Sequence, residues 1–260
     1  MTHQFCKVER EHHLTLISIE RPQVLNALHP PAHHELAAVF DDFAADPEQR
    51  LAIITGCGTR AFCVGNDLKY RAAHGRPNMP ASGFAGLTAR FDLDKPVIAA
   101  VNGLALGGGF ELALACDLIV ADAQAQFGLP EVSVGLAALA GGLQRLPRQI
   151  GIKAAMGIAL TGRRVSAAEA YALGCINEIA AAGDALVAAR SWAAQILSAA
   201  PLAVSAAKQV MMRGLQEADL RTAIAHQERH PAVQTLRASE DAIEGPRAFA
   251  ERRAPQWRQR

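Results

Sequence analysis

The sequence has few aromatic residues and almost no net charge. Among 260 residues, aromatics make up 5%, and 26 Lys and Arg residues face 25 Asp and Glu residues, for a formal net charge of +1. A balance this even creates no field that favours nucleic acid or a membrane surface, so we expect neither as a partner. The scarcity of aromatics, together with abundant alanine, favours close-packed helices over an all-β sandwich.

A long apolar run and a cysteine pair are also absent. Charged residues or glycines interrupt every window of roughly 18 residues, the length that crosses a membrane. The N-terminal residues lack the basic start and the apolar stretch of a secretory signal. The five cysteines are an odd number without a C-x-x-C pair, which indicates reduced thiols. We therefore expect a cytoplasmic protein.

Strands and helices alternate in the first part of the chain. Short apolar, β-branched runs predict buried strands at 14–19, 51–55, 96–101 and 118–121. Between them, apolar periodicity predicts helices at 30–45, 84–91 and 110–115. Loop is expected over 56–80, and a mobile surface loop over 73–83. This alternation indicates parallel strands.

The last 60 residues are predicted to be helical. Apolar periodicity indicates helices at 201–212, 216–229 and 239–251. A capping box at Ser166 and Glu169 marks an earlier helix start. The predicted organisation is an α/β core that holds the active site, residues 1–200, followed by a helical region, residues 201–260.

Two turns carry candidate chemistry, one in segment 61–69 (AFCVGNDLK) and one in segment 101–111 (VNGLALGGGFE). In the second, a triple glycine follows a strand and precedes a helix, where free N–H groups and the positive end of the helix dipole can stabilise an oxyanion. Asn66 in the first turn could supply a second N–H donor. A plain tight turn is the other interpretation of the glycines. The spacing fits neither a dinucleotide fingerprint nor a phosphate loop.

Two glutamates stand in apolar surroundings. Glu111 lies in the run FELALAC, and Glu131 follows Pro130 in segment 127–131 (FGLPE), 20 residues further on (131 − 111). Burial would raise the pKa of such carboxyl groups. Hydration of a conjugated double bond needs a proton for the α-carbon and a water aimed at the β-carbon, and two carboxyl groups can supply both. From spacing alone, a surface helix glutamate and a turn glutamate remain the alternatives.

Metal binding is not expected. His226 and His230 have the i, i+4 spacing of helical metal ligands, but no further ligand accompanies them. A G-x-S-x-G elbow is also missing, which argues against a serine hydrolase of the α/β type.

Together these segments resemble the crotonase family, the enoyl-CoA hydratase/isomerase superfamily. The likeness covers nearly the whole chain, beginning at Arg21-Pro22 and Asn26-Ala27-Leu28. Beyond the segments above it includes 94–103 (DKPVIAAVNG), 141–146 (GGLQRL), 161–163 (TGR), 167–170 (AAEA) and 249–253 (FAERR). The resemblance implies a spiral of ββα units, a helical C-terminal trimerisation region, and a homotrimer or a hexamer built as a dimer of trimers. It implies no metal and no separate cofactor, because coenzyme A is part of the acyl-CoA thioester substrate.

The resemblance also assigns roles to single positions. It implies that the backbone N–H groups of Asn66 and Gly108 hold the thioester oxygen, and that Glu111 and Glu131 are catalytic. Asn66 stands where family members commonly have Ala, which leaves the backbone amide in place. The remaining implied contacts of substrate or coenzyme A are Val64, Asp67, Leu68, Lys69, Leu139, Phe249 and Arg252, the last two reaching coenzyme A from a neighbouring subunit.

Retention of both glutamates favours hydration of a 2-enoyl-CoA. Segments 83–88 and 239–246 resemble the branch of the family that dehydrates carnitinyl-CoA. That branch has an acidic residue where this chain has Leu139, and a trimethylammonium group would gain from a carboxylate or an aromatic cage. We therefore rank general enoyl-CoA hydration first. Enoyl-CoA isomerisation by Glu131 alone and a catalytically silent acyl-CoA-binding homologue are the remaining alternatives.

Overall fold

The chain forms two compact units. The computed structural model describes residues 3–75 and 78–260. One unit comprises Met1–Phe91 and Val97–Ala193, and the other comprises Asp92–Pro96 and Ala194–Arg260. The mobile loop expected over 73–83 lies partly outside the described residues. An oligomerisation role for residues 201–260 stays a prediction.

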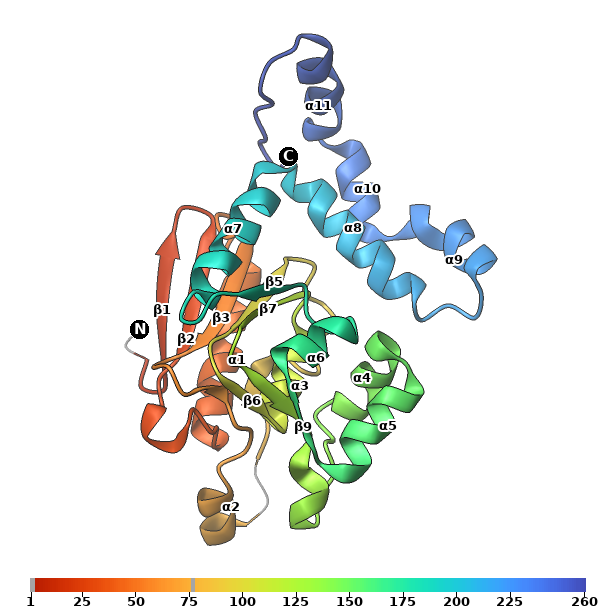
Figure 1. Ribbon diagram of the computed structural model, residues 1–260. Coiled ribbons are helices and arrows are strands. Elements are labelled where there is room, and N and C mark those ends of the chain that lie inside the picture. The colour runs from red at the N-terminus through yellow and green to blue at the C-terminus, as the bar shows by residue number, and fades with distance from the viewer. Residues whose placement is uncertain (1–2, 76–77) are drawn as a thin grey trace. The chain divides into compact units, whose positions relative to one another are not determined.

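The first unit contains two sheets (Figure 1). The larger sheet has the strand order β1 (Cys6–Glu11), β2 (Leu14–Ile19), β3 (Leu51–Gly56), β5 (Val97–Val101), β7 (Leu118–Asp122) and β10 (Glu178–Ala180). The smaller sheet has the order β4 (Ala61–Cys63), β6 (Leu104–Leu106), β8 (Gln126–Gly128) and β9 (Arg164–Ser166). Neighbouring strands are parallel except in the pairs β1–β2 and β8–β9, as the alternation of elements predicts.

The chain between residues 51 and 134 repeats one unit three times. Each repeat adds a strand to the larger sheet, then a short strand to the smaller sheet, and then a helix. The three repeats are β3-β4-α2 (Leu68–His74), β5-β6-α3 (Gly108–Ala115) and β7-β8-η3 (Pro130–Val134). The predicted spiral of ββα units is thus confirmed. Because β4, β6 and β8 are parallel neighbours, the loops that leave their carboxyl ends lie along one edge of the smaller sheet.

The core is built from the apolar residues that the sequence pattern selects. Helix α1 (Pro30–Ala45) buries Leu36, Val39, Phe40 and Phe43, which recur at helical spacing. All residues of β3 and β5 are buried, as expected for parallel strands covered on both faces. Ser166 caps α6 (Ala167–Ala172) by accepting the N–H of Glu169 at 3.2 Å, which confirms the helix start; the Glu169 carboxylate pairs with Arg163.

Several elements differ from their predictions. The expected loop over 56–80 contains β4 and α2, and the expected helix over 84–91 is only the short 3-10 turn η2 (Phe84–Gly86). Strands of three residues carry too little periodicity to be found in a sequence, because their hydrogen bonds depend on neighbouring strands. Strand β1 was missed because it is an edge strand with a polar sequence. Helix α3 begins at Gly108 instead of 110, which puts two of the glycines inside its first turn.

Apart from the short 3-10 turn η1 (Pro22–Val24), the remaining helices follow residue 141. They are α4 (Gly142–Ile150), α5 (Ile152–Thr161), α7 (Ala185–Ser198), α8 (Pro201–Gly214), α9 (Leu220–His226), η4 (Gln227–Arg229), α10 (Pro231–Ala238) and α11 (Asp241–Ala250). Helix α10 was not predicted. Within residues 3–75 and 78–260, no helix combines the length and the apolar character needed to span a membrane.

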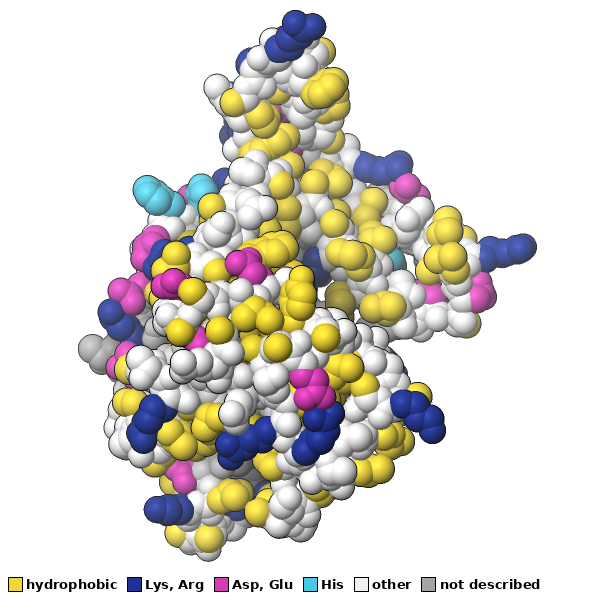
Figure 2. Space-filling view, viewed as in Figure 1, with side chains coloured by type: hydrophobic (Ala, Val, Ile, Leu, Met, Phe, Trp, Pro, Cys, Tyr) yellow, Lys and Arg dark blue, Asp and Glu magenta, His cyan; other side chains and the backbone are white. Residues whose placement is uncertain are grey.

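The second unit exposes many large hydrophobic side chains. Hydrophobic side chains are visible on the surface of its helices (Figure 2). On α8, on α9 and between them, the exposed ones include Met211, Leu215, Leu220 and Ile224, of which Leu215 is 77% exposed. Exposed apolar clusters of this kind are typical of surfaces that pack against another protein.

Candidate active site

The turn after β4 is fixed by a bridge to Leu28. The N–H of Leu28 donates to the carbonyl of Gly65, and its own carbonyl accepts the N–H of Asp67, both at 2.8 Å. In a parallel bridge of this kind the residue between the two partners, Asn66, turns its own N–H to the opposite side. The bridge therefore points the backbone N–H of Asn66 away from Leu28 and leaves it available to donate to a ligand.

The Arg21-to-Leu28 segment holds this bridge in place. The side-chain amide of Asn26, a residue with φ of +57°, donates to the carbonyls of Cys57 at 3.0 Å and Ala61 at 2.8 Å. Arg21 forms an ion pair with Asp67 at 3.1 Å, with both side chains nearly buried. The carboxylate of Asp67 also caps α2 by accepting the N–H of Tyr70 at 3.1 Å. These contacts explain why the chain has Arg and Asn at these positions.

Each glycine of the triple-glycine turn makes room for a different neighbour. A Cβ on Gly107, whose φ is +53°, would lie 2.8 Å from Oε1 of Glu131. On Gly108 it would lie 2.5 Å from the ring of Phe84, and on Gly109 it would overlap the carbonyl oxygen of Cys63. The three glycines therefore do more than form a tight turn, because side chains here would displace Glu131, Phe84 and β4.

The two predicted amide donors lie in adjoining turns. Gly108 is the first residue of α3, so its N–H has no acceptor within the helix, whose first bond runs from the Glu111 N–H to the Gly107 carbonyl at 3.0 Å. A Cβ on Gly65 would lie 3.0 Å from the Gly108 nitrogen, which means that the turn containing Asn66 packs directly on this helix start. The structure thus brings both amides to the same edge of the smaller sheet.

Glu111 is a buried carboxyl group one turn into α3. Its side chain is 3% exposed, and Oε1 accepts the N–H of Gly142 at 2.8 Å. Burial, with the nearby charge of Glu131, raises the pKa of Glu111 to about 7, although the amides of Gly142 and Ala140 and the Arg145 guanidinium oppose the shift. A carboxyl group with this pKa can exchange a proton near neutral pH.

Glu131 is half-buried beside the start of α3, in the first turn of η3, which follows β8. Its Oε1 lies against Gly107, and its Oε2 is buried without a hydrogen-bond partner among the described residues. Burial raises the pKa of Glu131 above its ordinary value. A buried carboxyl oxygen without a partner is costly, and such atoms are often found where a substrate or water binds.

Arg145 connects the Glu111 environment to residues 88–91. It donates to the carbonyl of Thr88 at 2.8 Å, and its guanidinium carbon lies 5.8 Å from the centre of the Phe91 ring. Burial lowers the pKa of Arg145, which nevertheless keeps its charge. Its position in α4 fixes the Gly142 turn that holds Glu111.

The other predicted contact residues are half-buried or exposed. Val64 is half-buried in the first turn, whereas Leu68 and Lys69 are exposed at the start of α2. Leu139 is 83% exposed, in the loop whose next residues bond Glu111. Phe249, 88% exposed, and Arg252 belong to the second unit. Their approach to coenzyme A from a neighbouring subunit stays a prediction.

One group of residues has the composition of a metal site. Ligand atoms of His3, Cys6 and Glu35 lie within 4.8 Å of one another. However, the Glu35 carboxylate already accepts the N–H groups of Gln4, Phe5 and Cys6 at 2.7–2.9 Å. Burial also raises the pKa of the Cys6 thiol, which keeps it protonated. The donor set therefore suits a structural clamp between β1 and α1 better than a metal.

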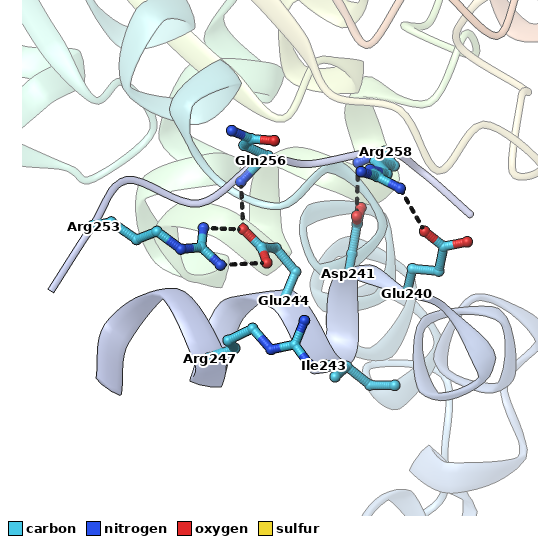
Figure 3. A pocket seen from close by; sticks show the side chains of 8 residues that line it. All are labelled: Glu240, Asp241, Ile243, Glu244, Arg247, Arg253, Gln256 and Arg258. Atoms are coloured by element: carbon cyan, nitrogen blue, oxygen red, sulfur yellow. Dashed lines mark hydrogen bonds and ion pairs between the residues drawn. The ribbon is translucent and has the colours of Figure 1, made fainter. Parts of the chain in front are cut away.

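A cavity of about 500 Å³ lies in the second unit (Figure 3). Its acidic side chains are engaged: Glu244 pairs with Arg253 at 2.5 Å and accepts the N–H of Gln256 at 2.8 Å, while Asp241 accepts the N–H of Arg258 at 2.7 Å. These bonds fasten the last ten residues to α11. The cavity is therefore explained by the packing of the chain end on α11.

Comparison with known proteins identifies the family. The enoyl-CoA hydratase/isomerase family model matches residues 9–260. The chain belongs to the enoyl-CoA hydratase/isomerase family. It is 44% identical over 248 residues to the carnitinyl-CoA dehydratase of Proteus mirabilis, and 43% identical over 251 residues to that of Salmonella typhi, with 94% of each chain covered.

Solved structures of this family share the fold. The enoyl-CoA hydratase of Mycobacterium tuberculosis H37Rv superposes with a TM-score of 0.92 at 41% identity, covering 98% of this chain and 99% of that one. The enoyl-CoA hydratase of Bacillus anthracis gives a TM-score of 0.90 at 36% identity, covering 99% and 100%. The α/β crotonase fold expected from the sequence is thereby confirmed.

Sequence reasoning did not single out two residues beside the site. Arg145 lies within a segment that carried the family resemblance, but no role was inferred for it. His33 was considered only as part of an H-E-x-x-H metal motif, which the sequence does not complete, although it precedes Leu36 by three and Phe40 by seven residues, a spacing that puts it on the buried face of α1. A polar residue on an apolar helix face was the available signal.

Proposed function

We propose that this chain is an enoyl-CoA hydratase, which reversibly adds water to the double bond of a 2-enoyl-CoA thioester to give a 3-hydroxyacyl-CoA. The observation that carries the proposal is the presence of two desolvated carboxyl groups, Glu111 and Glu131, beside the free helix-start amide of Gly108. Family members that only isomerise need one acid, so the second carboxyl group favours hydration.

The two amides of Asn66 and Gly108 bind the thioester oxygen in this mechanism. As water adds to the β-carbon, negative charge moves through the α-carbon to that oxygen, and donors aimed at it lower the barrier. Loss of one such donor typically costs roughly 3–4 kcal/mol. The dipole of α3 adds to the stabilisation, because its positive end lies at Gly108.

The two carboxyl groups handle the protons. One must be ionised to take a proton from water, and the other must be protonated to give a proton to the α-carbon. Each turnover therefore leaves the proton on the base, and it must pass back to the acid through water before the next turnover. Glu131, whose Oε1 lies against Gly107 and whose Oε2 has no hydrogen-bond partner among the described residues, is suited to deliver the α-proton. Glu111, with Oε1 held by Gly142, is suited to orient the water through its other oxygen. Their mutual repulsion favours a state with a single proton on the pair.

The test uses crotonyl-CoA and follows the loss of absorbance of the conjugated thioester. We expect turnover by the wild type and loss of roughly 10²–10⁴-fold in Glu111→Gln and in Glu131→Gln. Glu35→Gln is the matched control, because this half-buried carboxylate of α1 accepts the N–H groups of Gln4, Phe5 and Cys6 around the start of β1. Absence of wild-type turnover across several acyl chain lengths would leave the acyl-CoA-binding homologue as the better description.

A carnitinyl-CoA dehydratase is the second candidate, because relatives with that name are 43–44% identical. Leu139 argues against it, since an exposed leucine offers no charge to a trimethylammonium group. Equal enzyme amounts should be compared on crotonyl-CoA and crotonobetainyl-CoA. A clear preference for the latter would reverse the ranking. Leu139→Glu should shift kcat/KM toward the cationic substrate.

A homotrimer, or a hexamer made of two trimers, is the assembly that we propose. The exposed hydrophobic side chains around α8 and α9 support it, because a lone chain would leave them in water. Phe249 and Arg252 would then reach coenzyme A bound to the neighbouring subunit. Light scattering coupled to size-exclusion chromatography distinguishes these assemblies from a monomer.

A further inference from the structure

A buried histidine lies close to the residues that carry the two amide donors, Asn66 and Gly108. His33, on the inner face of α1, is 0% exposed. Its Nδ1 accepts the N–H of Ala85 at 3.0 Å, and Ala85 has a φ of +52°, so this contact holds a backbone turn that the residue would not adopt by itself.

The bond to Ala85 determines the protonation of the ring. Because Nδ1 is the acceptor, the proton of the neutral imidazole is on Nε2. Nε2 faces Oδ1 of Asn66 at 3.4 Å, so the ring donates toward the Asn66 side chain. Burial lowers the pKa of His33 to about 4, which keeps this neutral form at neutral pH.

The same ring also supports the other amide. His33 packs edge-on against Phe84 with ring centres 4.5 Å apart. The Phe84 ring in turn occupies the space beside Gly108, where a Cβ would lie 2.5 Å from its Cε2 atom. The His33 imidazole therefore contacts Asn66 directly, and it supports Gly108 through the ring of Phe84.

We propose that His33 is a positioning residue of the two-amide site, anchoring Asn66 through its Nε2–H and holding Phe84 against Gly108. The inference rests on the proposed function and deepens it, because it names what keeps the two donors aligned. In this chain the Asn66 side chain gives the His33 ring a hydrogen-bond acceptor, which an alanine at position 66 could not provide. Without Asn66, the buried Nε2–H would be left unpaired, at a cost in stability.

The experiment compares His33→Asn with His33→Gln. An asparagine can accept the Ala85 N–H as Nδ1 does but cannot reach Asn66, whereas a glutamine can reach Asn66 as Nε2 does. The probe is 4-(dimethylamino)cinnamoyl-CoA, whose absorption moves to longer wavelength when donors polarise its carbonyl. For His33→Asn we expect a smaller wavelength shift at saturating enzyme. We also expect kcat on crotonyl-CoA to fall about tenfold, less than the roughly 10²–10³ that follows removal of a whole donor.

Three comparisons separate positioning from a general loss of stability. Thr15→Val removes a buried hydrogen bond to Gln49 of 2.8 Å in the same unit, and should lower thermal stability without changing the probe's wavelength. In a double-mutant cycle, Asn66→Ala and His33→Asn should be non-additive in kcat, because both remove one interaction. His33→Gln should recover part of the shift.

The outcomes distinguish this inference from the proposed function. A His33→Asn enzyme with the wild-type wavelength shift and the wild-type kcat overturns the inference while the hydratase stands. If the wild type shifts the probe but hydrates no enoyl-CoA, the proposed function fails, and the wavelength shifts of the variants still decide the role of His33. If the wild type binds the probe without any shift, both are wrong.

Discussion

Replacing Glu111 by glutamine should slow hydration by at least roughly 10²-fold and at the same time stabilise the protein above neutral pH. The pKa of Glu111 is raised from 4.5 to about 7 by burial, so the folded chain binds more protons than the unfolded chain between these values. Wild-type stability must therefore fall as pH rises through that window. At 1.36 kcal/mol per pH unit, the full cost of ionising the buried group is roughly 3 kcal/mol, present above pH 7 and absent below pH 4.5.

Glutamine avoids this cost because it stays neutral and its carbonyl can still accept the N–H of Gly142, which Glu111 accepts at 2.8 Å. Urea unfolding of both proteins, at equal concentration, should give similar free energies at pH 4.5 and a variant more stable by up to roughly 3 kcal/mol at pH 8. Turnover of crotonyl-CoA by the variant should be lower by at least roughly 10²-fold across the same range.

Glu35→Gln is a control for which the pKa shift, and therefore the expected change in stability, has the opposite sign. Burial alone would raise the pKa of Glu35, but the N–H groups of Gln4, Phe5 and Cys6 lower it below its ordinary value. Its ionised form therefore stabilises the fold at pH 7, and the glutamine variant should be less stable there, with the difference shrinking as pH falls through the folded pKa. A stability difference for Glu111→Gln that stays constant from pH 4.5 to 8 would refute the argument that this carboxyl group is desolvated.

Three further predictions follow from single contacts. Glu131→Gln should lower kcat by at least roughly 10²-fold while calorimetry shows unchanged affinity for the 3-hydroxyacyl-CoA product, and a proportionate loss of affinity would count against a proton-transfer role. Gly109→Ala should destabilise the fold by about 3 kcal/mol, since its Cβ would overlap backbone, whereas Gly157→Ala, with open space around it, should be neutral or stabilising in thermal unfolding. Phe249→Ala should raise KM for the acyl-CoA roughly 5- to 30-fold with little change in kcat if its exposed ring contacts coenzyme A; an unchanged KM would remove it from the site.

The sequence by itself determined the elements whose stability is local. Helix α1 has the bounds predicted from its proline start and apolar spacing, and the strand at Leu14–Ile19 likewise matches its apolar run. The N-cap at Ser166 required only residues within one helical turn. The triple glycine and the two acids were also recognisable, because a turn before a helix and a charged group in an apolar run are unusual within their own segments.

Only the tertiary structure decided how these pieces meet. The three-residue strands β4, β6 and β8 exist because each pairs with a neighbour far away in sequence, and their pairing brings the loops with Asn66, Gly108 and Glu131 to one edge. The unpaired Oε2 of Glu131 and the contacts of His33 depend on chain segments that lie dozens of residues apart. Propensity and spacing report on neighbours along the chain. A pKa, or whether a backbone N–H is left without an acceptor, depends instead on the residues that folding packs around the group.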